Sequence, residues 1–121
     1  QSFYTTEKYS IGGRRLDADS GSYLTGGGAS TDACLLFGNI IYESSDLYLY
    51  KDGNLIDSNT DFLTDGNTSN TDSKTITLMG LDASTTTYFP GTLFEAMICV
   101  PAVTSKRTAI EAEMNRRWAL Y

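Results

Sequence analysis

The middle of the chain holds two successive apolar segments, each with the pattern of a β-strand. Residues 33–42, ACLLFGNIIY, form an almost continuous apolar run, which is typical of a strand buried on both faces. Residues 46–51, DLYLYK, alternate strictly, so Leu47 and Leu49 share one face and the polar and aromatic residues share the other. The second pattern predicts a strand with one face on a hydrophobic core.

A turn signal follows the second strand. Asp52 and Gly53 favour the backbone of a two-residue hairpin, so residues 54–57 are expected to return as a short strand. Residues 57–73 are polar and contain the tetrapeptide SNTD twice. They predict a long loop or a frayed strand pair.

Further strands are expected on both sides of this hairpin. Residues 74–80 alternate again, and residues 91–100 form a final apolar strand. Pro101 should end that strand, because proline cannot donate to a ladder. Residues 9–11 and 22–25 are short strand candidates in the first third of the chain.

The last segment of the chain has helical periodicity. Thr104 or Ser105 is expected to cap the helix. Ile110, Met114 and Trp118 recur at every fourth position and form one apolar stripe. The stripe predicts a helix that packs on the sheets, with Trp118 as a structural residue; a tryptophan that binds a partner is the alternative.

Two Arg–Glu pairs have the i,i+4 spacing that places side chains next to each other on a helix. These are Arg107 with Glu111, and Glu113 with Arg117. Both pairs are expected on the outer faces of the helix.

The closing segment carries a motif that extends from the last strand to the helix. Phe89, Gly91, Leu93 and Glu95 follow at every second position, and Trp118 lies near the helix end. This order resembles the end of concanavalin A-like (laminin-G-like) jelly-roll domains, in which the final strand reads F-x-G-x-(I/L)-x-E. The hairpin at residues 46–57 also resembles one in that family, which often reads L-Y-V-N-G.

The resemblance implies an all-β fold: an antiparallel β-sandwich of jelly-roll type with one C-terminal α-helix. It covers residues 33–121 well and residues 1–32 weakly. We therefore expect one domain, residues 1–121, that lacks the N-terminal strands of the full family fold. Two explanations are open: the chain is the C-terminal part of a longer polypeptide, which we favour, or another subunit completes the sandwich.

Charge and hydropathy narrow the classes of partner. The chain has 121 residues and a formal net charge of −6, and its basic clusters are pairs of arginines. Since nucleic-acid binding needs basic side chains to neutralise phosphates, nucleic acid is not an expected partner. A membrane span needs about 18 consecutive apolar residues, and the sequence contains no such run.

The two cysteines, Cys34 and Cys99, lie in apolar runs and are expected to be free thiols in core strands. A disulfide between them stays open, because two positions in a sequence cannot establish a pairing.

Catalysis has little support in the sequence. The chain has no histidine, which excludes Ser–His–Asp and Cys–His mechanisms. Glycosidases use paired carboxylates, but Glu95 has no second acid two or four residues further on. Glu95 is therefore expected to be a structural carboxylate, buried or half-buried and hydrogen-bonded, and the protein is not expected to be an enzyme.

Two candidate binding sites remain. Asp46, Tyr48 and Tyr50 share the outer face of one predicted strand, and two tyrosines about 7 Å apart can stack on a sugar ring. A neighbouring element that covers these tyrosines is the alternative.

The second candidate is a calcium site. Asp57, Asn59 and Asp61 have the first three ligand positions of a calcium loop, but Phe62 and Thr68 stand where an EF-hand needs glycine and glutamate. A looser calcium site in this loop stays possible, and a solvated acidic loop is the default. No other cofactor is expected.

Together these features predict a non-catalytic recognition module outside the cell, on a virion or a secreted protein, that binds carbohydrate and acts in adhesion. The alternative is a purely structural virion or filament subunit that completes its sandwich with other chains. A homo-oligomer or a larger assembly is expected in either case.

Overall fold

The computed structural model describes residues 8–13, 22–28, 32–61, 92–99 and 104–121. The chain divides into two compact units. One consists of Gln1–Asn70 with Pro101–Tyr121, and the other of Thr71–Val100. Each unit is described by itself.

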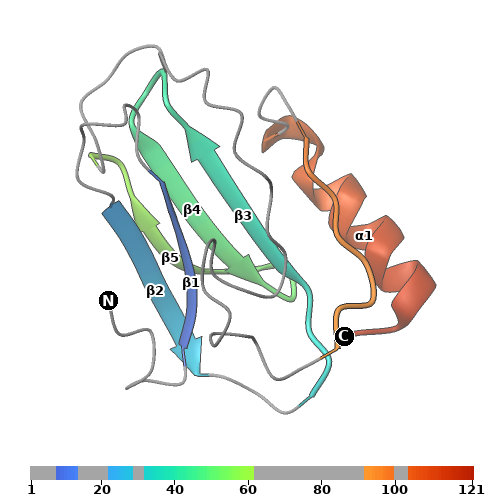
Figure 1. The fold of residues 1–121 in the computed structure, drawn as a ribbon. Helices are drawn as coiled ribbons and strands as arrows, with labels where there is room; N and C mark the ends of the chain where they lie inside the picture. Colours follow the sequence, from blue (N-terminus) through green and yellow to red (C-terminus); the bar gives the residue numbers. More distant parts are fainter. Residues whose placement is uncertain (1–7, 14–21, 29–31, 62–91, 100–103) are drawn as a thin grey trace, which may run out of the picture. The chain divides into compact units, whose positions relative to one another are not determined.

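The described part of the first unit contains two antiparallel sheets (Figure 1). β1 pairs with β2 in one sheet, and β3, β4 and β5 follow in chain order in the other. The candidate strands in the first third of the chain and the central hairpin are thereby confirmed. The bounds are β1 Lys8–Gly13, β2 Ser22–Gly28, β3 Leu36–Ile41, β4 Asp46–Lys51 and β5 Asn54–Asn59.

The core of this unit lies between the two sheets. Leu47 and Leu49 of β4 are 0% and 2% exposed, and they cluster with Leu24 of β2. The alternation predicted for residues 46–51 is therefore confirmed. Half-buried side chains from the strands and the β3–β4 turn pack around this cluster: Tyr9, Ile11, Ile40, Tyr42 and Ile56.

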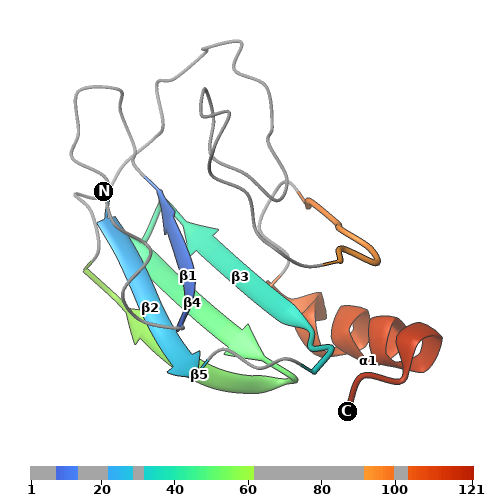
Figure 2. The ribbon, with the colours of Figure 1, turned by 60° about the horizontal axis from the view of Figure 1, so that its bottom comes forward.

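Two glycines let the sheets approach each other, with β1 and β2 lying against the three-stranded sheet (Figure 2). A Cβ at Gly38 of β3 would lie 2.0 Å from Cδ1 of Ile11 on β1. A Cβ at Gly26 of β2 would lie 3.0 Å from the carbonyl oxygen of Ile56 on β5. At both positions a side chain would occupy space that the opposite sheet already fills.

The turn between β4 and β5 has the geometry that its sequence predicts. Asp52 and Gly53 have φ angles of 50° and 79°, as a two-residue turn of type I′ requires at both central positions. The Asp52 carboxylate also accepts a hydrogen bond from the backbone N–H of Leu35 at 2.8 Å. The turn is thereby tied to the residue before β3.

The prediction of a strand buried on both faces at residues 33–42 is wrong. β3 does form there, but Leu36 is 44% exposed, Gly38 is exposed, and the buried residue of β3 is Asn39. An apolar run indicates that a segment can be buried, whereas the number of layers packed on it is decided by residues elsewhere in the chain.

The C-terminal helix forms as expected, but its start and its buried face differ from the prediction. A 3₁₀ turn, η1 Thr104–Lys106, precedes α1 Arg107–Trp118, so Lys106 stands at the N-cap and makes no capping bond with its side chain. The predicted cap by Thr104 or Ser105 is wrong. Among the residues that the structure describes, no helix has the length and hydrophobicity for a membrane crossing.

The buried residues of α1 are Glu111 and Met114. Ile110 is half-buried, and Trp118 is 42% exposed. Trp118 is therefore not one of the buried residues of α1. The helix therefore buries part of the predicted stripe together with the polar Glu111, and the Trp118 end of the stripe is exposed.

Asn115 organises the end of α1. Its side-chain oxygen accepts hydrogen bonds from the backbone N–H groups of Leu120 and Tyr121, at 2.7 and 2.9 Å. Ala119 adopts a left-handed backbone with φ 48°, and its N–H donates to the Asn115 carbonyl. The Ala119 bond satisfies a carbonyl of the last helical turn, and the two side-chain bonds satisfy N–H groups of the residues that follow the helix.

In the second unit, the described residues are 92–99. The structure assigns no strand to them, and Leu93, Phe94, Met97 and Ile98 are 45–63% exposed. The prediction of a final apolar strand across residues 91–100 is therefore wrong for residues 92–99. Apolar periodicity predicts burial, but a strand also needs a neighbour in register, which the local pattern does not supply.

The fold class is thus supported at the level of an all-β arrangement: two antiparallel sheets with one short C-terminal helix. The strand expected at residues 74–80 and most of the loop expected at 57–73 lie outside the described residues. At the beginning of that stretch, β5 extends to Asn59, two residues beyond the predicted return strand, which disagrees with a loop there and leaves the frayed strand pair open.

Candidate recognition face

The face of β4 opposite the core carries the three residues predicted for sugar binding. Asp46, Tyr48 and Tyr50 alternate with the buried leucines, and all three are half-buried. The register places Ile41, Asn39 and Phe37 of β3 directly opposite them, on the same face. We call this set of six residues the outer face.

The aromatic rings on the outer face form a tilted cluster rather than a flat platform. The centroids of Tyr48 and Tyr50 are 6.5 Å apart with an interplanar angle of 33°. Phe37 meets Tyr50 edge-on, at 6.1 Å and 73°. The Tyr50 ring therefore contacts one ring on its own strand and one ring on β3.

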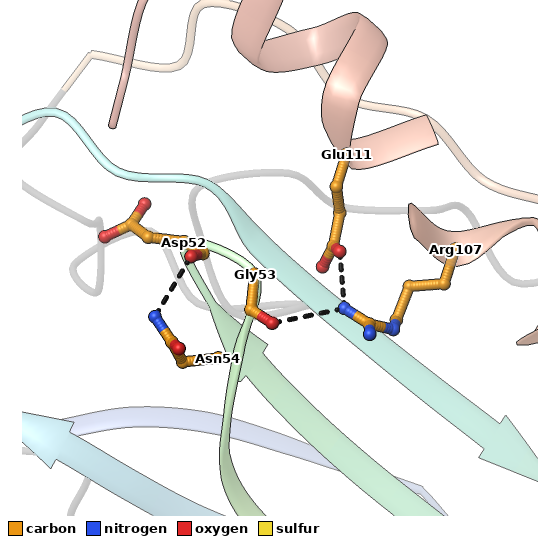
Figure 3. A network of polar contacts seen from close by, with 5 residues as sticks. All are labelled: Asp52, Gly53, Asn54, Arg107 and Glu111. Atoms are coloured by element: carbon orange, nitrogen blue, oxygen red, sulfur yellow. Dashed lines mark hydrogen bonds and ion pairs between the residues drawn. The ribbon is translucent and has the colours of Figure 1, made fainter. Parts of the chain in front are cut away.

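Arg107, the first residue of α1, lies over the Tyr50 ring. Its guanidinium carbon is 4.0 Å from the ring centroid, within the range of a cation–π contact. The same guanidinium donates a hydrogen bond to the carbonyl of Gly53 in the β4–β5 turn, at 3.4 Å, and pairs with Glu111 (Figure 3). One cation thus connects α1, the turn and the outer face.

The Arg107–Glu111 pair does not lie on the outer side of the helix, as its spacing predicted. The two side chains are 21% and 5% exposed. A carboxylate this deeply buried needs a partner, because an unpaired buried charge is costly. Arg107 therefore neutralises Glu111 in addition to contacting Tyr50.

Tyr121 lies beside the same β4–β5 turn. Its hydroxyl oxygen would lie 3.5 Å from a Cβ placed on Gly53. Burial raises the pKa of the Tyr121 phenol; the carboxylates of Glu111 and Asp52 raise it further, and Arg107 opposes them. The Tyr121 hydroxyl therefore stays protonated at neutral pH beside two carboxylates and one cation.

A second contact joins the outer face to the start of the helix. The side-chain amide of Asn39 donates a hydrogen bond of 2.7 Å to the Thr104 hydroxyl. Asn39 is 6% exposed and lies opposite Tyr48 in the register. This bond accounts for a buried amide in the middle of an apolar strand.

Asp46 lies at the other end of the outer face. One of its carboxylate oxygens accepts a hydrogen bond of 2.5 Å from the Ser44 hydroxyl. Asp46 and Tyr48 are two residues apart on one strand, so their side chains project from the same face.

The three calcium candidates lie at the end of β5 and just beyond it. The register places Asp57 opposite Leu49 and Asn59 opposite Leu47, so both belong to the core side of the sheet. Their side-chain oxygens accept bonds from the backbone N–H groups of Ser58 and Asp61, at 2.9 and 2.8 Å. Within the described ranges, no group of three or more acidic or thiol side chains gathers into a metal site.

The remaining predicted residues lie outside the outer face. Glu95 is half-buried in the second unit, and its role as a structural carboxylate stays a prediction. Cys34 and Cys99 are free thiols, as expected, but Cys34 is half-buried and Cys99 exposed, so neither is a core residue. The Cys34 thiol donates to the Tyr9 hydroxyl at 3.3 Å.

No known protein family matches the chain, and no curated protein or solved structure shows a significant similarity to it.

Sequence reasoning missed two members of this region, Arg107 and Asn39. The signal for Asn39 was a lone amide inside the apolar run of residues 33–42. The signal for Arg107 was its spacing: Arg107, Glu111 and Met114 recur at intervals of four and three residues and therefore share one helix face. A charged pair aligned with an apolar stripe can lie on the packed side of a helix.

Proposed function

We propose that this chain is a non-catalytic recognition module that binds carbohydrate through the outer face of β4, with Tyr48 and Asp46 as the contact residues. The observation that carries the proposal is the half-buried Tyr48 ring beside the Asp46 carboxylate, on a strand whose opposite face is used for the core. A tyrosine ring offers an apolar surface to the C–H groups of a pyranose, and a carboxylate accepts hydrogen bonds from its hydroxyls.

Tyr50 has a reduced role in this proposal. Its ring is already in contact with Arg107 and Phe37. A sugar on the outer face therefore meets Tyr48 first, and the predicted two-tyrosine platform becomes a platform of one tyrosine with a carboxylate beside it.

The proposal includes a finer assignment of the fold, an antiparallel β-sandwich of the concanavalin A-like jelly-roll type. In its favour are an antiparallel β3–β4–β5 sheet against a second antiparallel sheet and a hairpin with an Asp-Gly turn. Domains of this type are frequent in tail fibres, capsid decorations and adhesins, so a place on a virion or a secreted protein is part of the proposal.

The experiment is a glycan array followed by titration of the strongest ligand. We expect saturable binding that Tyr48→Ala weakens by about tenfold or more, because one ring–sugar stack is lost. Asp46→Asn should weaken it as well, since the neutral amide is a weaker acceptor than the carboxylate.

Trp118→Ala is the matched control, because it removes an exposed aromatic side chain from the helix rather than from the outer face. Binding that Trp118→Ala abolishes and Tyr48→Ala leaves intact would move the site to the helix. An array without any saturable signal would contradict the proposal as a whole.

A structural subunit is the second candidate function, and one observation favours it. Leu93, Phe94, Met97 and Ile98 expose 45–63% of their surface within one short segment. Such apolar side chains are typical of surfaces that another chain covers. This candidate predicts a stable oligomer in size-exclusion chromatography with light scattering, and no glycan signal.

A further inference from the structure

Three contacts of polar or charged side chains join η1 and α1 to the three-stranded sheet and its β4–β5 turn. Thr104 accepts a hydrogen bond from Asn39, and Arg107 donates to the Gly53 carbonyl and covers the Tyr50 ring. Two of these three contacts depend on the Arg107 side chain. The attachment of α1 therefore depends strongly on one guanidinium.

The apolar residues of α1 are buried to different extents. Met114 is buried and Ile110 is half-buried, whereas Trp118 and the nearby Tyr121 are 42% and 53% exposed. A helix with a small buried apolar area opens locally at a lower free-energy cost than a core strand such as β4. The amount of apolar burial therefore favours a helix that can detach while the sheets stay folded.

The position of Arg107 has a consequence for Tyr50. A guanidinium 4.0 Å from the ring centroid occupies the face of the ring on which a sugar would stack. The neighbouring ring of Tyr48 is 6.5 Å away. Removal of Arg107 would leave two adjacent tyrosines available on one strand.

We propose that α1 is a releasable cover of Tyr50, with Arg107 as its latch. With the latch closed, the outer face presents Tyr48. With the latch open, it presents Tyr48 and Tyr50 together, which suits an oligosaccharide of several sugar units rather than a single sugar. A ligand that contacts both tyrosines shifts the population toward the open state, because it binds that state more tightly. The part of this inference that concerns glycans rests on the proposed function; the latch does not.

The latch is tested without any ligand, by nitrating tyrosines with tetranitromethane and mapping the modified residues by mass spectrometry. The variant is Arg107→Gln combined with Glu111→Gln, which removes the latch without leaving a buried charge unpaired. The lost cation–π contact and hydrogen bond should make α1 open about tenfold more often or more. We expect faster nitration of Tyr50 and unchanged nitration of Tyr48.

Hydrogen exchange of backbone amides provides a second measurement of helix opening on the same proteins. Backbone amides of residues 107–118 should exchange faster in the double variant, while those of β4 stay protected. Arg116→Ala is the matched control, because Arg116 pairs with Glu113 on the exposed side of the same helix. Unchanged Tyr50 nitration and unchanged α1 exchange in the double variant would overturn the latch.

The glycan part uses the strongest array ligand as a monosaccharide and as its tetrasaccharide. The double variant should gain affinity for the tetrasaccharide by about tenfold, the factor by which opening becomes easier, and gain nothing for the monosaccharide. Equal changes for both sugars would overturn the two-tyrosine site. An array without signal, together with faster Tyr50 nitration, would reject the proposed function and leave the latch intact.

Discussion

The two faces of β4 differ in burial and in the contacts that their side chains make. Leu47 and Leu49 on the inner face are 0% and 2% exposed and pack with Leu24 of the other sheet. Asp46, Tyr48 and Tyr50 on the outer face are half-buried and meet a hydroxyl, a guanidinium and other rings. The alternation of the strand therefore separates the side chains that form the core from the side chains for which we propose a role in recognition.

This difference has a clear energetic expectation. Removal of an inner-face side chain creates a cavity in a closely packed layer, whereas removal of an outer-face side chain mainly changes a surface. If the comparison is correct, stability should follow the inner face and ligand binding the outer face.

The largest change in stability is expected for Leu49→Ala. This change should lower the free energy of unfolding by about 2–5 kcal/mol, because a fully buried leucine loses its contacts and leaves a cavity. Leu55→Ala, at a leucine of β5 that is 52% exposed, is the control. Urea denaturation of both proteins measures the difference, and an equal loss for the two would break the comparison.

A second test concerns the contact between the sheets at Gly38. Gly38→Ala should lower the free energy of unfolding by about 1–3 kcal/mol, because the new Cβ would lie 2.0 Å from the Ile11 side chain. Ile11→Val removes the nearest atom, so the double variant should recover part of the loss. A double-mutant cycle by denaturation measures this coupling, and strictly additive losses would show that the two sheets do not meet there.

A smaller effect is expected for Asn39→Ala, which removes the bond between the outer face and Thr104. The free energy of unfolding should fall by about 1 kcal/mol, which is the usual net contribution of one hydrogen bond. Thr108→Ala, at an exposed position of α1, should change little. Thermal denaturation would contradict this expectation if the two variants lost the same stability.

The smallest effect concerns the exposed ion pairs of α1. The hydrogen bond from Arg116 lowers the pKa of Glu113, with additional attraction from Arg116 and Arg117. Because the folded-state pKa is lowered, the resulting stability is present above the usual pKa of 4.5 and is lost as the pH falls through the lowered value.

Arg116→Ala should therefore move the Glu113 pKa back toward its usual value, which NMR titration of the Glu113 carboxyl carbon can follow. An unchanged Glu113 pKa in this variant would mean that the pair does not form in solution. Arg116 can be compared directly with Arg107, because each pairs with a glutamate of α1. Of the two, Arg107 is the one that also contacts a residue of the sheet, Tyr50.

The sequence predicted the part of the fold that depends on local periodicity. The two-residue period of β4 identified both of its faces, and Asp52-Gly53 identified the turn. For residues 92–99 the same reasoning failed, because a strand needs a neighbour in register and apolar side chains indicate only a tendency to be buried.

The candidate site was predictable to the same extent. Asp46, Tyr48 and Tyr50 do share one face, since strand alternation fixes which side chains lie together. The contact of Arg107 with Tyr50 was not predictable, because it depends on how α1 docks against the sheet. The exposure of Trp118 was not predictable either. The helix period defines the apolar stripe, but the docking of the helix decides which part of that stripe is buried.

The most direct test of the central claim is a tyrosine-ring NMR titration with the strongest array glycan. Ring signals of Tyr48 should shift with saturation, whereas those of Tyr9 and Tyr42, which pack against the core, should stay in place. Shifts at Tyr9 or Tyr42 without a shift at Tyr48 would contradict the assignment of recognition to the outer face of β4.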